Sequence, residues 1–188
     1  MARRPTKRVD PKALFDHAEA HRQSRQLLNT FAQTLEPGPP MVGYMRSALI
    51  ISALSNEIFL KCIYTIENDG FLPETNVHAL DKLFYLLSHS AQNLIEIEWD
   101  RMITLSPILQ ASRNKFGIKI DLKSSLDAGA KAFIQYRYAY EGEALSGYGL
   151  GNLSEVLCNV IAIDKPEWGP TFDWPPLPDI NWSNDRGM

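Results

Sequence analysis

Two charged residues interrupt an otherwise apolar segment in the first half of the chain. Glu57 and Lys61 lie within residues 44–67, YMRSALIISALSNEIFLKCIYTIE, which contain no Gly or Pro. A spacing of four residues places both side chains on one face of a helix, with the acid on the N-terminal side, where the pair is favourable. They share that face with Ile50 and Leu54, so a solvated surface is not expected there. Buried charges must be paired, and we interpret this pair as part of a buried polar cluster.

A second unusual segment, YRYAYE at 136–141, surrounds one arginine with three tyrosines. Arg137 carries a planar charge that suits phosphate or carboxylate groups. Tyr138 and Tyr140 each combine an apolar ring with a polar hydroxyl, and Glu141 adds a carboxylate one helical turn after the arginine. Side chains of these types predict the rim of a pocket that binds a nucleotide or the end of an RNA.

All four histidines precede this second segment. His17 and His21 have metal-ligand spacing, but no third acidic, His or Cys ligand is near, so an exposed helical face is the preferred interpretation. His78 falls in the first turn of an expected helix, opposite its apolar stripe. Taken alone it is a surface residue, but it is also a candidate member of one polar network with Glu57, Lys61 and Arg137. No metal or other cofactor is predicted.

The spacing of apolar residues predicts an all-α fold, an up-and-down bundle of five to six helices. Helices are expected at 11–35, 44–67, 77–88, 91–105, 121–141 and 153–163, with turns rich in Gly, Pro and Asn between them. In the first helix, Asp10 is the expected N-cap and Pro11 the first helical residue. Its solvent-exposed face is expected to carry His17, His21, Arg22 and Arg25.

The ends of the chain differ in character from this bundle. Residues 1–10 are basic and are expected to be disordered, and residues 11–163 form the predicted helical domain. Residues 164–188 are rich in Pro and Trp, which predicts an extended tail that wraps over its own domain or a partner subunit. Such a tail is a candidate docking segment for another protein.

Composition excludes several classes of protein. The chain has 188 residues, 45% of them hydrophobic, which suffices for one domain with a sizeable core. A net charge of −3 argues against binding to polyanions through overall charge, but it leaves room for a local basic patch. Two cysteines in apolar contexts are interpreted as reduced core thiols. Neither a membrane span nor a signal peptide is predicted, so a cytoplasmic location is expected.

Three separated motifs together resemble the pattern of HEPN domains. They are Glu57-Ile-Phe-Leu-Lys61, then His78-Ala-Leu-Asp-Lys-Leu83, then the segment 133–141, FIQYRYAYE, which contains Arg137. HEPN domains are four- to five-helix bundles of prokaryotic defence, toxin–antitoxin and nucleotide-linked systems. The resemblance covers residues 44–141 and implies a homodimer. Many HEPN proteins resemble metal-independent ribonucleases in which an arginine is followed four to six residues later by a histidine.

This chain departs from that ribonuclease motif, because no histidine follows Arg137. RNA cleavage needs a proton acceptor and a proton donor beside the scissile phosphate. The preferred hypothesis is therefore a non-catalytic module that binds RNA, a nucleotide or a protein partner in a defence or stress-related system. One alternative is a metal-independent ribonuclease that uses Glu57, Arg137 and Glu141. The other is a purely structural adaptor that docks a partner through the tail. Whether the chain is an enzyme stays open.

Overall fold

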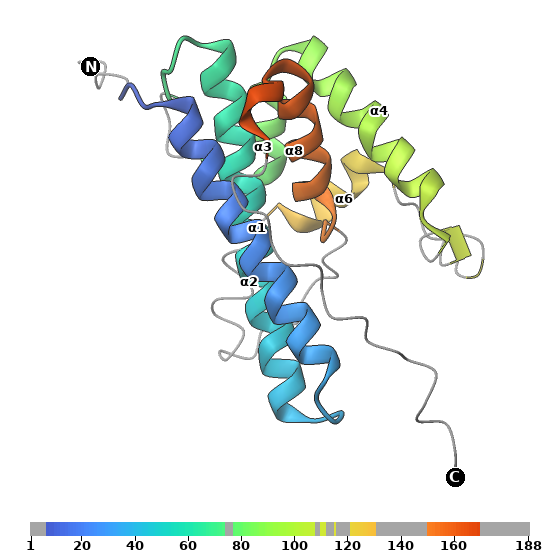
Figure 1. Cartoon of the computed structure of the whole chain (residues 1–188). Helices are drawn as coiled ribbons and strands as arrows, with labels where there is room; N and C mark the ends of the chain where they lie inside the picture. The colour runs from blue at the N-terminus through green and yellow to red at the C-terminus, as the bar shows by residue number, and fades with distance from the viewer. Residues whose placement is uncertain are drawn as a thin grey trace.

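The computed structural model of the chain describes residues 7–73, 77–107, 110–111, 115, 121–130 and 150–169. Within them the fold is all-α, which confirms the prediction of fold class. The helices are α1 (Pro11–Gln33), α2 (Pro39–Glu67), α3 (Leu80–Tyr85), α4 (His89–Leu105), α6 (Leu122–Gly129) and α8 (Leu153–Asp164), followed by the 3-10 turn η2 (Pro166–Trp168). Figure 1 shows α1 and α2 as a long antiparallel hairpin, with α8 and α4 beside its upper half.

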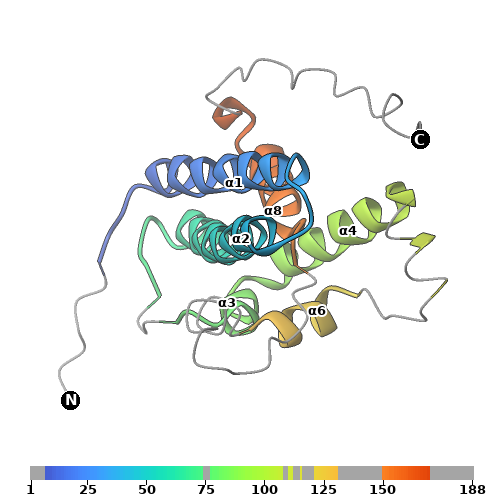
Figure 2. The same ribbon diagram turned by 90° about the horizontal axis from the view of Figure 1, so that it is seen from below.

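Helix α2 is the centre of this arrangement. Seen from below, α1 lies on one side of α2, and α3 and α6 lie on the opposite side (Figure 2). The buried side chains of α2 include Phe59, Leu60 and Ile63, and Phe59 meets Phe15 of α1 edge-on with ring centroids 5.9 Å apart. A helix that is apolar on most of its faces is stable only when neighbours cover several of them, as they do here.

By length and composition alone, α2 could cross a membrane. However, 61% of its most apolar stretch is buried inside the structure, and the core helix of a soluble protein can have the same length and hydropathy. The helix begins at Pro39, five residues before the expected start at 44. Pro39 and Pro40 occupy its first turn, where no backbone N–H is needed for a helical hydrogen bond, so the prolines begin this helix rather than only ending the previous one.

The ends of other helices also differ from expectation, by up to three residues. Helix α3 covers only residues 80–85 of the expected 77–88, and α4 begins at His89 because Ser88 caps it, its hydroxyl accepting from the Ala91 N–H. Asp10 caps α1 with Pro11 at its first position, as predicted. The described residues cover 121–130 of the expected helix at 121–141. Most of the predicted extended tail, at 170–188, lies outside the described residues. The part that is described is not extended, because Asp164 ends α8 and Pro166–Trp168 form the turn η2.

Residues 7–10, expected to be disordered, are extended and lie against residues 70–72. The Val9 N–H donates to the Gly70 carbonyl at 2.8 Å, and the Leu72 N–H donates to the Lys7 carbonyl at 3.1 Å. Gly70 has a φ of 87°, and a Cβ there would lie 2.9 Å from the Val9 carbonyl oxygen. The turn after α2 therefore needs a glycine, both for its left-handed backbone and for the close approach of the N-terminal segment.

Candidate functional site

The carboxylate of Glu57 holds two partners at a single oxygen atom. Its Oε1 lies 2.6 Å from the Lys61 Nζ and 2.9 Å from the His78 Nδ1. Glu57 is only 5% exposed, whereas the side chains of Lys61 and His78 are 21% and 58% exposed. A buried anion is thus compensated by one cation and one imidazole that extend toward the surface, an arrangement we call the Glu57 cluster.

Two elements bring the members of the Glu57 cluster together. Glu57 and Lys61 are one turn apart on α2, and the chain passes His78 immediately before it enters α3. Helix α3 packs on α2 with Leu80, Leu83 and Phe84 buried, and this packing fixes the segment that carries the imidazole. The sequence placed Glu57 and Lys61 on a buried strip and suggested His78 as a third member, and the structure brings all three into contact.

The hydrogen bond to Glu57 determines what the imidazole of His78 can do. A carboxylate accepts only, so the Nδ1 atom must carry a proton to donate to it. In the neutral ring the Nε2 atom is then an acceptor, and in the charged ring it is a second donor. The cluster can therefore either bind an anion through Lys61 and His78 or accept a proton at the Nε2 atom of His78.

The second group of predicted site residues is not described by the structure. Arg137, Tyr138, Tyr140 and Glu141 all lie within 131–149, outside the described residues. Their predicted approach to Glu57 therefore stays a prediction.

A second buried polar cluster, which the sequence reasoning missed, joins α1 to α8. Glu19 is 1% exposed. Its two oxygens each accept a hydrogen bond from Arg22 at 2.6 Å, and one also accepts from Gln23 at 2.9 Å. The Cys158 Sγ lies 3.8 Å from the same carboxylate. We call these residues the Glu19 cluster.

Arg25 extends this contact between α1 and α8. Its Nη2 lies 2.5 Å from Glu155 Oε1, and its Nη1 donates to the Gly151 carbonyl. Arg25 is 8% exposed and the Arg22 side chain 16%, so the prediction that both lie on a solvent-exposed face is wrong. Gly151 and the first turn of α8 cover the part of that face that carries Arg22 and Arg25. The signal in the sequence was Glu155, an acid in the first turn of the largely apolar helix α8, which favours a cation on the neighbouring helix.

Neither cysteine is suited to nucleophilic chemistry. Burial raises the pKa of Cys62 to about 12, with Asp10 and Asp16 adding to the effect. Burial, followed by the negative charge of Glu19, raises the pKa of Cys158 to about 11. The reactive form of cysteine is the thiolate, so both residues are inert thiols at neutral pH.

His17 and His21 lie side by side on α1. Their Nε2 atoms are 3.1 Å apart and their ring centroids 4.7 Å apart. His17 is exposed and His21 partly buried. Burial, and then the neighbouring His17, lower the pKa of His21 below its ordinary value. No group of three or more His, Cys, Asp or Glu side chains able to hold a metal ion occurs among the described residues.

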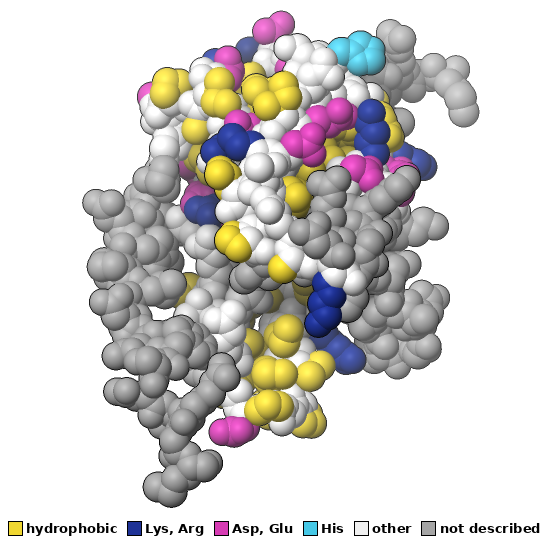
Figure 3. Space-filling model, turned by 90° about the vertical axis from the view of Figure 1, so that its right-hand side faces the viewer, with side chains coloured by type: hydrophobic (Ala, Val, Ile, Leu, Met, Phe, Trp, Pro, Cys, Tyr) yellow, Lys and Arg dark blue, Asp and Glu magenta, His cyan; other side chains and the backbone are white. Residues whose placement is uncertain are grey.

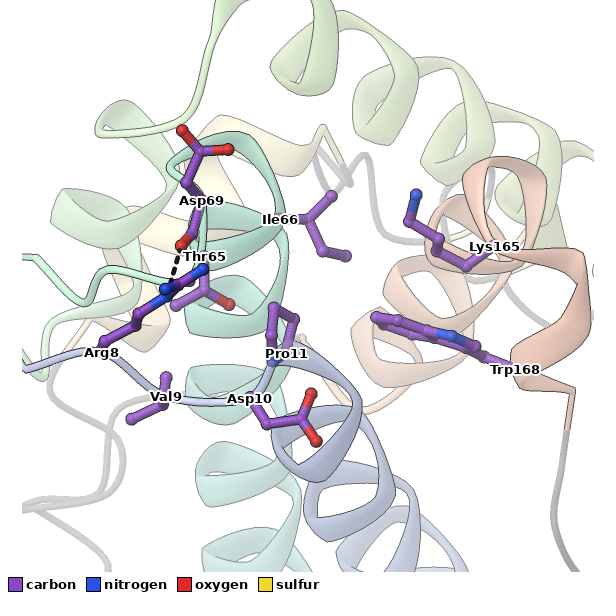
Figure 4. Close-up of a pocket in the computed structure, with 10 residues that line it drawn as sticks. Arg8, Val9, Asp10, Pro11, Thr65, Ile66, Asp69, Lys165 and Trp168 are labelled. Atoms are coloured by element: carbon purple, nitrogen blue, oxygen red, sulfur yellow. Dashed lines mark hydrogen bonds between the residues drawn. The ribbon is translucent and has the colours of Figure 1, made fainter.

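A cavity of about 600 Å³ lies between the N-terminus of α1, the C-terminus of α2 and the turn η2. Figure 4 shows Trp168 and Lys165 across from Pro11, with Arg8 donating to the Asp69 carbonyl on the far side. Opposite charges are mixed in its lining, and none of the three residues of the Glu57 cluster contributes to it. The cavity is therefore separate from the candidate site.

Comparisons of the chain with models of protein families, with curated proteins and with solved structures found no match. They neither support nor oppose the HEPN resemblance. The geometry of the Glu57 cluster is thus the basis on which a function can be proposed.

Proposed function

We propose that this chain is a HEPN-like module that binds RNA, or a nucleotide, through phosphate contacts of Lys61 and His78. The observation that carries the proposal is the Glu57 cluster, in which one buried carboxylate fixes a cation and an imidazole at the surface. Arg137, in the motif that resembles the HEPN arginine, is proposed to add a further phosphate contact. The module is proposed to act as a homodimer in the cytoplasm, in a defence or stress-related system.

The charges of the cluster agree with a phosphate ligand. The carboxylate neutralises one cation, so the group has no net charge when His78 is neutral and one positive charge when it is protonated. A phosphate can accept hydrogen bonds from the Lys61 ammonium and from a protonated His78 ring. Contacts with Glu57 hold the Lys61 ammonium and the His78 imidazole in place. This lowers the entropic cost of ordering these two side chains when the ligand binds.

A second candidate function is a metal-independent ribonuclease, and the hydrogen bond between Glu57 and His78 is the observation that favours it. A carboxylate that holds an imidazole at its Nδ1 atom leaves the Nε2 atom to take a proton from an RNA 2′-hydroxyl. In this alternative His78 is the general base, Glu57 positions it, and Lys61 or Arg137 stabilises the charge on the phosphate. The histidine absent after Arg137 is then replaced by His78, which lies just before α3.

Binding is tested by fluorescence anisotropy with a labelled single-stranded RNA of mixed sequence in EDTA, over a range of salt concentrations. If Lys61 contacts phosphate, Lys61→Ala weakens binding to the same extent for all RNA sequences. It also reduces the slope of log K against log salt concentration by about one. Lys12→Ala is the matched control, because Lys12 pairs with Asp16 at the same spacing of four residues but on α1. Equal loss in both variants, or no RNA binding at about 50 mM salt, would refute the proposal.

Cleavage is tested with the same RNA in a time course in EDTA, using variants shown to be folded by circular dichroism. If His78 is the general base, His78→Ala slows cleavage by about a hundredfold or more, whereas His89→Ala, at an exposed position, leaves it unchanged. Glu57→Gln is expected to slow cleavage as well, because the imidazole of His78 loses the carboxylate that positions it. Binding without cleavage by the wild-type chain excludes the ribonuclease and leaves the binding module.

Assembly is tested separately by light scattering of the full chain. A molar mass of two chains agrees with the proposed homodimer, and a molar mass of one chain at high protein concentration excludes it. Removal of residues 170–188 tests the adaptor hypothesis, because loss of assembly or of a bound partner only in the shortened chain would assign docking to the tail.

A further inference from the structure

The histidine pair on α1 has a geometry that the proposed function does not use. His17 and His21 are separated by one helical turn, and their Nε2 atoms lie 3.1 Å apart. This is a hydrogen-bond separation, and the tautomers of the two rings decide which nitrogen donates. A cation bound by both nitrogens would replace this contact, and the backbone of α1 keeps the two rings on the same face.

The separation of the two nitrogens matches the bite of a transition-metal ion. Imidazole nitrogens bind Zn²⁺ at about 2.0–2.1 Å. Two such bonds at an angle between about 90° and 109° place the nitrogens about 2.9–3.4 Å apart. The observed 3.1 Å falls inside this range. The absence of a third protein ligand among the described residues leaves the remaining coordination positions to water, as an exchangeable surface site requires.

We propose that His17 and His21 form a bidentate binding site for a borderline divalent transition-metal ion such as Ni²⁺ or Zn²⁺. Imidazole suits Zn²⁺, Ni²⁺ and Cu²⁺, whereas Mg²⁺ and Ca²⁺ take oxygen ligands. Once one ring holds the ion, the second binds within the same molecule at a high effective concentration. The exposure of His17 gives the ion direct access from solvent.

The site is tested by isothermal titration of the untagged full chain with Ni²⁺, and then with Zn²⁺, after treatment with EDTA. The expected result is one ion per chain. His17→Ala and His21→Ala each weaken binding about tenfold or more, because each leaves a single imidazole. His89→Ala, at an exposed position outside the Glu57 cluster, is the matched control and binds as the wild type does. Equal affinities of the wild type and His21→Ala would overturn the proposal, as would loss of binding in the control.

Thermal unfolding gives a second, independent measurement. A metal ion that binds only the native state stabilises it by RT ln(1 + c/Kd), where c is the concentration of free Ni²⁺. At an Ni²⁺ concentration of ten times Kd, the Tm of the wild-type chain should rise by about 3–6 °C, and EDTA should reverse the rise. The same concentration of Mg²⁺ should leave Tm unchanged. A rise of equal size in His17→Ala would refute the bidentate site.

Discussion

Replacing Glu19 with glutamine tests whether the Glu19 cluster stabilises the contact between α1 and α8. The side chain keeps its volume but loses its charge. Arg22, 16% exposed at its side chain, then loses its closest counter-ion and keeps only Glu155, whose Oε1 lies 3.7 Å from the Arg22 Nη1. Removal of one partner of a buried pair costs about 3–5 kcal/mol, and partial exposure of Arg22 places this case at or below the lower end. We expect a loss of about 2–3 kcal/mol, or about 4–12 °C in Tm.

The matched control is Glu98→Gln on α4. Glu98 pairs with Arg101 at the same spacing of three residues and the same distance of 2.6 Å, but the Arg101 side chain is 52% exposed. Urea unfolding followed by circular dichroism should show little change for this variant. If Glu19→Gln costs no more than Glu98→Gln, the reasoning from burial is refuted. Replacing Glu19 and Arg22 together by leucine should recover most of the loss, because no unpaired charge remains.

Three further predictions concern the thiols, one helix cap and the core. Because burial raises the pKa values of Cys62 and Cys158 to about 12 and 11, iodoacetamide at pH 8 should label the native chain far more slowly than the chain in urea, by mass spectrometry. The unfolded thiols lose their protons first, so stability should decrease as pH rises above about 9. Ser88→Ala should cost about 1 kcal/mol in urea unfolding through the lost N-cap of α4, and an unchanged midpoint would contradict this. Trp99→Ala should cost about 3–5 kcal/mol, whereas Ile97→Ala, at a position 62% exposed, should stay within about 0.5 kcal/mol.

The parts of the fold that the sequence predicted well depend on neighbouring residues. Asp10 and Pro11 mark the start of α1 by local hydrogen bonding and backbone geometry, and the bounds of α8 differ from the expected 153–163 by one residue. The spacing of Glu57 and Lys61 is also local, and so their contact was predictable. The start of α2 was missed because Pro39 and Pro40 are compatible both with the end of one helix and with the beginning of the next.

The parts that the sequence did not predict depend on contacts between distant residues. Arg25 belongs to an exposed face when α1 is considered alone, and only the packing of α8, 130 positions away at Glu155, makes it a buried partner. Helical periodicity separates a polar face from an apolar one. It does not show whether the polar face contacts water or the polar side chains of a neighbouring helix. The extended segment at 7–10 is a similar case, because its hydrogen-bond partners are residues 70–72.

The contact of Arg25 with Glu155 has a consequence for biosynthesis. Ribosomes add about 5–20 residues per second. Glu155 of α8 is therefore synthesised several seconds or more after Arg25 of α1, its partner. During that interval Glu19 and Arg25 remain hydrated, which keeps the nascent α1–α2 hairpin soluble on that side. Helix α8 can cover the face of α1 that carries Arg25 only after its own residues have been synthesised, so a polar surface suited to water becomes an internal one late in synthesis.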